Sequence, residues 1–151
     1  MLALRKAETP DVAAIQALAR AAYGRYIDRI GRPPAPVSAD YAAAVTRGEV
    51  WVATDGADVV GLLVLVAKAD HLLLENVAVL PSAQGTGIGG RLLALAEEQA
   101  MTLGLAEIRL YTHVTMSENI AYYPKHGYVA THRGNDDGFD RVNFTKRLPG
   151  H

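Results

Sequence analysis

The chain has 151 residues, and its 50% apolar and 21% charged side chains are typical of one globular domain spanning residues 1–151 rather than of a disordered protein. The 15 basic and 16 acidic side chains give a formal net charge of −1, so composition offers no case for partners such as nucleic acid or an anionic membrane. Cysteine is absent, which excludes disulfides, thiolate metal ligands and a cysteine nucleophile.

The first predicted elements are a short strand and a helix. Leu2 and Leu4 alternate with their neighbours in a strand-like pattern. Thr9 is predicted to cap the helix, with Pro10 in its first turn, and apolar residues at helical spacing continue it to Ala22.

A proline-rich segment follows this helix. Residues 29–40 contain Gly31 and three prolines, which disfavour a regular helix, and we predict a loop there. A short helix over residues 39–47 is predicted to end at Gly48.

Three strands are predicted next. Residues 50–54 and 59–66 surround a turn at residues 55–58, which predicts an antiparallel hairpin whose second strand is buried on both faces. Residues 72–79 form a third apolar strand, and Pro81 ends it.

A long amphipathic helix is predicted after this strand and ends at Gly104. Glu97 and Glu98 are predicted to face solvent. The residues of its predicted buried stripe are Ile88, Leu92, Leu95, Ala96 and Leu103.

The next predicted pair is a strand over residues 107–112 and a helix over residues 115–125. Thr115 and Glu118 have the spacing of a capping box at the start of that helix. Gly127 is predicted to end it.

The last two strands are predicted at residues 128–132 and 142–146, around a polar turn at residues 135–138. The resulting order is β-α-α-β-β-β-α-β-α-β-β. This order predicts an α/β fold with a mixed, predominantly antiparallel sheet flanked by helices.

We expect a cytoplasmic protein without a metal site. The apolar start is soon interrupted by Lys6 and Glu8, unlike an export signal, and the longest apolar stretch, residues 59–67, is too short for a membrane helix. The 5 histidines are scattered and show no ligand spacing.

A glycine-rich turn between the strand at residues 72–79 and the long helix is the most informative segment. Glycine lets the backbone adopt a positive φ and approach a ligand, and the first turn of a helix has N–H groups without helical partners. These features predict a phosphate-binding turn. Its residues are Gln84, Gly85, Thr86, Gly87, Ile88, Gly89 and Gly90.

Other interpretations of this turn were weighed on the residues around it. The segment fits the G-x-G-x-x-G pattern of dinucleotide-binding proteins, but that pattern requires an acid at the end of the next strand, where this chain has Thr112. A P-loop is excluded because Arg91 follows Gly90. A turn that binds nothing is the remaining alternative, although glycine lowers helix stability by about 1 kcal/mol per residue.

A resemblance to a known family favours one interpretation. The segment Gln84-Gly85-Thr86-Gly87-Ile88-Gly89 resembles the Gln/Arg-x-x-Gly-x-Gly/Ala signature of the GNAT superfamily of N-acetyltransferases. Residues 119–128 are similar to a segment of that family that ends in the motif Tyr-x-Lys-x-Gly-Phe. Tyr123 is the first residue of this motif, and Tyr128 stands in place of its Phe. The predicted order of elements is also that of the family, over essentially the whole chain.

The resemblance implies that acetyl-CoA is the cosubstrate and that it lies between two splayed strands, residues 72–80 and 107–112. Its pyrophosphate would bind N–H groups of residues 84–90, and its pantetheine arm would bind the backbone of Val77 and Val79. The other residues that the resemblance places at the cosubstrate are Ala78, Asn119 and Tyr122.

Direct transfer of the acetyl group to an amine is the simplest mechanism. By the resemblance Tyr123 would be the general acid for the departing thiolate, with a role in packing alone as the alternative. Pro124 is expected to bias Tyr123 away from α geometry. Glu75, a lone acid in an apolar strand, is the candidate base, expected to be buried with a raised pKa, although a structural ion pair would explain it as well. His113 is the reserve base, and the Val77 N–H is the candidate oxyanion donor.

The acceptor is predicted to be a primary amine of a small or amino-acid-like molecule, with a peptide amine as the alternative. Two other function classes stay open, a non-catalytic acyl-CoA sensor and a dinucleotide-binding oxidoreductase. We expect a homodimer, because the last strands have exposed sheet edges that could pair with a second copy. The residues available for the acceptor pocket are Tyr23, Tyr26, Arg29, Arg32, Asp40, Tyr41, Asp140 and Arg141.

Overall fold

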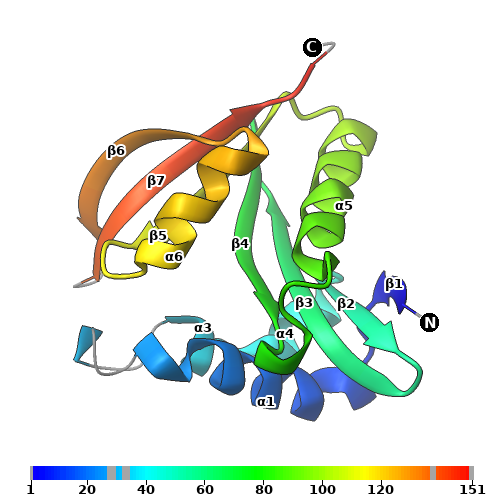
Figure 1. The fold of residues 1–151 in the computed structure, drawn as a ribbon. Coiled ribbons are helices and arrows are strands. Elements are labelled where there is room, and N and C mark those ends of the chain that lie inside the picture. The colour runs from blue at the N-terminus through cyan, green and yellow to red at the C-terminus, as the bar shows by residue number, and fades with distance from the viewer. Residues whose placement is uncertain (1, 27–29, 32–34, 137–138, 150–151) are drawn as a thin grey trace. The chain divides into compact units, whose positions relative to one another are not determined.

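The computed structural model describes residues 2–26, 30–31, 35–136 and 139–149, and its strands form one mixed 7-stranded sheet in the order β1-β2-β3-β4-β5-β7-β6 (Figure 1). The predicted α/β fold is confirmed, and the order of elements is as predicted apart from an additional short helix at Ala35–Ser38. The strands are β1 (Leu2–Lys6), β2 (Val50–Asp55), β3 (Asp58–Ala67), β4 (Leu72–Val79), β5 (Glu107–His113), β6 (Val129–Asp136) and β7 (Phe139–Arg147). The helices are α1 (Val12–Tyr23), α3 (Ala35–Ser38), α4 (Tyr41–Thr46), α5 (Ile88–Thr102) and α6 (Ser117–Tyr122).

The chain divides into two compact units. The first unit comprises residues 1–65 and 76–95, and the second comprises residues 66–75 and 96–151. The elements β3, β4 and α5 each begin in one unit and end in the other. Each of these three elements therefore supplies residues to both units.

In the first unit, β1, β2 and β3 pair in antiparallel ladders. The turn of the predicted hairpin is shorter than expected, because Asp55 pairs with Asp58 and only Gly56 (φ 62°) and Ala57 lie between them. Residues 61–65 of β3 are buried without interruption, which confirms the expected burial of this strand on both faces.

Gly61 lets α5 approach β3 closely. A Cβ at Gly61 would lie 3.1 Å from Leu92 Cδ1 and 3.2 Å from Ile88 Cγ2. Both distances are below the roughly 3.5–4.0 Å at which carbon atoms make favourable contacts. The buried stripe of α5 therefore packs against bare backbone in this part of the sheet.

The start of α1 differs from the prediction. Glu8, rather than Thr9, is the N-cap of a short 3-10 turn (Thr9–Asp11) that leads into α1. Asp11 Oδ2 accepts a hydrogen bond from the Glu8 N–H at 2.7 Å, and the same carboxylate accepts two from Arg5, at 2.8 and 3.0 Å. A carboxylate provides more acceptor positions than a threonine hydroxyl, which is why Asp11 organises this end of the helix.

The proline-rich segment contains one turn of helix, α3, where a loop was predicted. Pro36 lies in its first turn, where a missing N–H breaks no helical hydrogen bond. α4 begins after Asp40, whose Oδ1 accepts from the Ala43 N–H at 3.0 Å. The chain turns at Gly48 (φ 73°), as predicted.

In the second unit, β5 and β6 flank β7 in antiparallel ladders. Within the described chain, the parallel ladder of β4 with β5 extends over Leu72 and Leu73, opposite Ile108 and Arg109. The next two residues of β4 in this unit lie outside that ladder.

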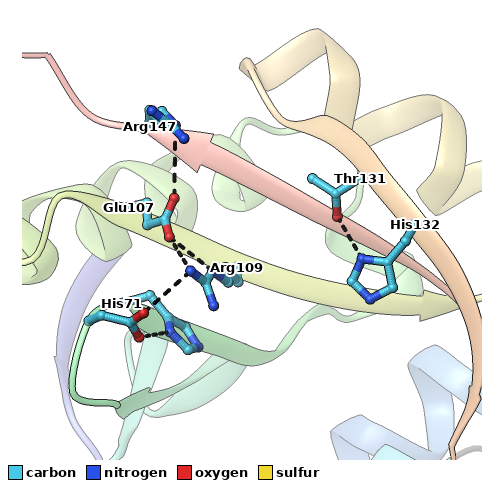
Figure 2. Close-up of polar contacts among 7 residues, drawn as sticks. His71, Glu107, Arg109, Thr131, His132 and Arg147 are labelled. Carbon is cyan, nitrogen blue, oxygen red and sulfur yellow. Dashed lines mark hydrogen bonds and ion pairs between the residues drawn. The ribbon is translucent and has the colours of Figure 1, made fainter.

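A polar network fastens this short parallel ladder (Figure 2). Arg109 Nε donates to Glu107 Oε1 at 3.0 Å, and Arg109 Nη2 lies 3.6 Å from Asp70 Oδ2. Asp70 Oδ1 in turn lies 2.7 Å from His71 Nδ1. The hydrogen bond with His71 and the charge of Arg109 lower the pKa of the Asp70 carboxyl, and together these contacts join the turn before β4 to β5.

Two predicted features of α5 are wrong. Leu103 is 53% exposed, because α5 ends at Thr102 and Gly104 (φ 71°) then reverses the chain. Glu97 is half-buried rather than solvent-facing, and its Oε1 lies 3.0 Å from Lys146 Nζ.

Among the described residues, no helix combines the length and apolar character that a membrane crossing requires.

The predicted capping box of α6 is also wrong. Met116 is the N-cap and makes no side-chain cap hydrogen bond. Thr115 instead turns back toward β5, since its N–H donates to His113 Nδ1 at 3.2 Å. Helix α6 is shorter than predicted, and a 3-10 turn (Tyr123–His126) connects it to Gly127, whose φ of 88° ends the helical segment as predicted.

The last two strands are longer than predicted. β6 extends to Asp136 and β7 begins at Phe139, so Asn135 and Asp136 of the predicted polar turn belong to the ladder. The remaining residues of that turn, 137–138, lie outside the described residues.

The Arg5–Asp11 contact should make the stability of the fold depend on pH. Its hydrogen bond lowers the pKa of Asp11 in the folded chain, so this stabilisation is present above the unfolded pKa of about 3.9 and is lost as the pH falls through the folded pKa. Asp11→Ala should lower the free energy of unfolding by about 1 kcal/mol at pH 7. Urea unfolding of the wild type and of Asp11→Ala at pH 7 and pH 2.5 measures this difference in the free energy of unfolding.

The difference between the two proteins should narrow at the lower pH, because a larger fraction of the wild-type carboxyl is then protonated. Asp58→Ala, at an exposed hairpin position, is the matched control and should stay within about 0.5 kcal/mol of wild type. An Asp11→Ala deficit that is equally large at both pH values would contradict this account.

Candidate functional site

The turn between β4 and α5 adopts the geometry that its glycines permit. A 3-10 turn (Pro81–Ala83) leads to an extended Gln84, and Gly85 and Gly87 have φ values of 82° and 86°. A Cβ at either glycine would meet no atom within 4 Å, so backbone conformation, not packing, requires glycine there. Gly89 and Gly90, predicted as part of the turn, lie within α5.

The first turn of α5 presents unpaired donors of the helix. The Arg91 N–H donates to the Gly87 carbonyl at 3.2 Å, which makes Gly87 the residue before the first helical turn. The N–H groups of Ile88, Gly89 and Gly90 consequently have no carbonyl four residues earlier in the helix. Residues 84–87 are exposed, and the helix dipole adds positive character, so this turn is suited to an anionic group.

Side chains of the turn brace it from within. Thr86 Oγ1 donates to the Ala83 carbonyl at 2.5 Å. Gln84 Nε2 donates to the Val79 carbonyl at 3.3 Å, a long bond. Gln84 therefore links the turn to the last residue of β4.

A buried amide on β4 organises the same unit. Asn76 is 6% exposed, and its Nδ2 donates to the Tyr41 hydroxyl at 2.7 Å. Tyr41 in turn donates to the Pro36 carbonyl at 2.5 Å. The Tyr23 hydroxyl contacts Asn76 Oδ1 and donates to the Val77 carbonyl at 2.8 Å.

This network connects α1, α3 and α4 to the half of β4 that was predicted to bind the cosubstrate. Tyr23 and Tyr41, predicted for the acceptor pocket, have their hydroxyls engaged there instead. The sequence analysis missed Asn76, although an asparagine within an apolar strand is a signal, because a buried amide needs partners. Ala78 is buried in the same stretch, and Val77 and Val79 are half-buried.

In the second unit, Tyr123 lies in an aromatic cluster. Its side chain is 6% exposed, and its ring centroid lies 5.6 Å from Tyr122, 5.7 Å from Tyr128 and 5.9 Å from Phe144. The expected bias of Pro124 is wrong, since Tyr123 has α geometry at φ −64° and ψ −39°. Pro124 is accommodated because it falls at the start of the 3-10 turn, where no helical donor is required.

The neighbours of Tyr123 that were predicted at the cosubstrate lie on α6. Asn119 Nδ2 donates weakly to Thr112 Oγ1 at 3.4 Å. Tyr122 is half-buried, which raises the pKa of its hydroxyl, and its ring lies 4.5 Å from that of His126. α6 therefore presents Asn119 and Tyr122 in the same unit as Tyr123.

The two candidate bases differ from expectation. Glu75 is exposed, so the prediction that it is buried is wrong; its position on β4 places it on the less buried face, with Leu73. His113 Nδ1 lies 2.9 Å from Thr115 Oγ1 and 3.2 Å from the Thr115 backbone nitrogen. His113 therefore has one ring nitrogen engaged with Thr115.

Other residues predicted for the acceptor pocket are engaged or lie outside the described residues. Asp40 caps α4, and Tyr26 is buried. Arg133 donates to both oxygens of Asp140, at 3.0 and 2.6 Å, and holds the pKa of that carboxyl below its usual range. Arg141 lies 4.2 Å from the ring centroid of Tyr111. Arg29 and Arg32 fall outside the described residues.

The second unit also has an open groove of about 730 Å³ that the sequence analysis did not predict. Figure 2 shows part of its wall, with Glu107 and Arg109 on one side and Thr131 beside His132 on the other. No predicted site residue lines this groove. In the described part of the chain, no group of three or more His, Asp or Glu residues is arranged to hold a metal ion.

Comparison with known proteins identifies the family. A family model of the acetyltransferase (GNAT) domain matches residues 46–130, more than half of the chain, and the chain belongs to this family. No curated protein matches the sequence.

Solved structures share the fold. The chain is similar to the PaiA N-acetyltransferase from Thermoplasma acidophilum, solved in complex with coenzyme A, at 20% identity and a TM-score of 0.82 over 98% of this chain and 99% of that chain. It is similar to the ribosomal-protein-S18-alanine N-acetyltransferase from Escherichia coli, at 20% identity and 0.76 over 98% and 94%. Nourseothricin acetyltransferase matches at 21% identity and 0.75 over 98% and 99%.

The buried network can be tested by removing one hydroxyl. Tyr41→Phe leaves Asn76 Nδ2 and the Pro36 carbonyl without their partner, so the free energy of unfolding should fall by about 1–3 kcal/mol. Thermal and urea unfolding measure the change.

Tyr128→Phe is the matched control, because the Tyr128 hydroxyl is buried without a hydrogen-bond partner among the described residues. Its removal should leave stability unchanged or raise it. Equal losses of unfolding free energy in the two variants would show that the hydrogen bonds of the Tyr41 hydroxyl do not stabilise the fold.

Proposed function

We propose that this chain is an acetyl-CoA-dependent N-acetyltransferase that transfers the acetyl group directly to a primary amine. The observation that carries this proposal is the turn of Gln84 to Gly87, followed directly by the backbone N–H groups of the first turn of α5, in a chain of the GNAT family. The family match also favours this activity over that of a dinucleotide-binding oxidoreductase.

The pyrophosphate of acetyl-CoA would bind the N–H groups of Ile88, Gly89 and Gly90, which combine free donors with the positive end of the helix. Residues 84–87 are exposed whereas Ile88 is buried, so the phosphates would approach these donors from the side of the turn. Gly85 and Gly87 would allow close approach of the phosphates to the backbone.

The pantetheine arm would bind along β4 as an added strand. The parallel ladder of β4 with β5 extends over Leu72 and Leu73, and the pantetheine would bind β4 beyond it, at Val77 and Val79. The Val77 carbonyl accepts from the Tyr23 hydroxyl at 2.8 Å, and a pantetheine amide would be a second donor to the same oxygen. The long bond from Gln84 to the Val79 carbonyl is one that a pantetheine amide would replace readily.

The transfer reaction would require three groups of this chain. The amine nitrogen attacks the thioester carbonyl, and the backbone N–H of Val77 would stabilise the oxyanion. The carbon–sulfur bond then breaks, and Tyr123 would give its proton to the departing thiolate. Glu75 would take the proton of the amine; its exposure allows transfer through water.

The acceptor is proposed to be a small or amino-acid-like amine. The names of the compared proteins span a protein alanine and an antibiotic, so they do not select between acceptor classes. A non-catalytic acyl-CoA-binding domain is the second candidate, because the exposed position of Glu75 provides no desolvated base. A homodimer through an edge strand such as β6, and the organisation of residues 1–151 as one domain, stay predictions.

The activity is tested with a panel of small amines, free amino acids and short peptides, incubated with acetyl-CoA and analysed by mass spectrometry. Acetylation of at least one small amine, with release of an equal amount of free thiol, is the expected result. Tight acetyl-CoA binding without any acetylated product would favour the sensor, and product only from peptides would overturn the acceptor assignment.

The turn is tested with a pair of alanine substitutions that each add one Cβ in open space. Gly87→Ala forces a side chain into a φ of 86°, a strain of about 1–2 kcal/mol, and should weaken acetyl-CoA binding about tenfold. Gly90→Ala lies in the helix and should stabilise the fold by up to about 1 kcal/mol, with binding nearly unchanged. Calorimetric titration distinguishes them, and equal affinities would exclude the turn as the cosubstrate site.

The catalytic roles are tested with Tyr123→Phe and Glu75→Gln. Each should lower kcat by about 100-fold or more, because each removes a proton-transfer group while leaving acetyl-CoA binding intact. Glu98→Gln, at an exposed position of α5, is the matched control and should retain the wild-type rate. Unchanged kcat in Tyr123→Phe or Glu75→Gln would refute the role of the residue concerned.

A further inference from the structure

The Tyr128 hydroxyl is a buried polar group without a hydrogen bond. Tyr128 is 3% exposed, and its hydroxyl oxygen has no hydrogen-bond partner among the described residues. Leaving a buried polar group unpaired typically lowers stability by about 1–3 kcal/mol. A phenylalanine would fill the same space without this penalty, and Phe is the residue of the motif that the segment resembles.

The nearest functional neighbour of this ring is Tyr123. The two rings meet edge to face, with centroids 5.7 Å apart and an interplanar angle of 70°. Phe144 covers the other side of Tyr123, with centroids 5.9 Å apart. Both tyrosines are buried, so an electrostatic change on one is screened little by water before it reaches the other.

A fixed cation neighbours the Tyr128 ring. Lys146 Nζ lies 5.9 Å from the ring centroid and is held by Glu97 Oε1 at 3.0 Å and by the His126 carbonyl at 2.7 Å. Burial raises the pKa of Tyr128, and the nearby Tyr123 and Glu97 raise it further. Tyr128 therefore keeps its proton throughout the working pH range and is a donor, not a base.

We propose that Tyr128 is a positioning residue for Tyr123, whose hydroxyl donates a hydrogen bond to the Tyr123 oxygen when that oxygen carries negative charge. This rests on the proposed role of Tyr123 as general acid. When Tyr123 gives its proton to the thiolate, the thiol forms and a phenolate remains. Tyr128 stabilises that phenolate without transferring its own proton, and the proton that Glu75 takes from the amine then returns through water to restore Tyr123.

The unpaired state in the resting chain follows from this role. A hydrogen bond to an ionised oxygen is roughly twice as strong as one between neutral groups, so the hydroxyl gains most when the phenolate forms. A contact with the phenolate oxygen, direct or through one water, would give the Tyr128 hydroxyl the partner that it lacks among the described residues. The unpaired hydroxyl destabilises the resting chain, and its hydrogen bond to the phenolate offsets this cost during turnover.

The test is Tyr128→Phe, which removes only the hydroxyl. The pKa of Tyr123 is read from ring ¹³C signals of tyrosine-labelled protein during a pH titration, and Tyr123→Phe assigns the signal. We expect the pKa of Tyr123 to rise by about one unit, a tenfold change in its ionisation equilibrium, and kcat to fall about tenfold with little change in KM for acetyl-CoA.

Tyr111→Phe, a matched substitution in the same unit, should leave the titration of Tyr123 unchanged. An unchanged Tyr123 titration in folded Tyr128→Phe would overturn the proposal, as would a shifted titration with wild-type kcat in an active enzyme. If the wild-type chain transfers no acetyl group, the proposed function fails, while the titration still decides whether the two hydroxyls interact.

Discussion

One buried amide, that of Asn76, determines how the helices of the first unit meet the central strand. Its donor side is bound to Tyr41 and its acceptor side to Tyr23, so residues of α1 and α4 both make polar contacts with β4 at this amide. Because an unpaired buried amide is strongly unfavourable, this arrangement tolerates few alternatives. Tyr23 also contacts the Val77 carbonyl, and the same hub therefore shapes the strand that was predicted to receive the cosubstrate.

The turn between β4 and α5 is suited to an anion because of its backbone N–H groups rather than because of charged side chains. Residues 84–90 contain no lysine or arginine, and the donors for an anion are main-chain N–H groups at the start of α5. Backbone donors are fixed by the helix itself, which keeps them oriented without a ligand. The positive φ values of Gly85 and Gly87 are what this geometry requires of the sequence. A net charge of −1 is compatible with such a site, since binding depends on local dipoles.

Local signals allowed most of the fold to be predicted. Alternation, β-branched runs and glycines at helix ends placed every strand within a few residues, because these features depend on neighbours in the chain. The errors have tertiary causes. Glu97 was placed in solvent because Lys146 is distant in sequence, and the capping box at Thr115 failed because His113 offered that residue a competing partner.

The candidate site was predicted less completely than the fold. The glycines of the turn were recognisable, since their conformation is visible in the pattern itself. The burial of Glu75 was not, because alternation along a strand does not say which face is covered. Asn76 was missed because its role depends on hydrogen-bond partners that are distant in the sequence. The Tyr128 hydroxyl was missed because only the structure reveals that it lacks a partner among the described residues.

The most direct test of the central claim follows the backbone amides of the turn by ¹⁵N NMR during separate titrations with acetyl-CoA and NAD. The account predicts saturable shifts with acetyl-CoA that are largest for Ile88, Gly89 and Gly90, and no comparable shifts with NAD. Binding of NAD at these amides, or acetyl-CoA binding that leaves them unmoved, would contradict it.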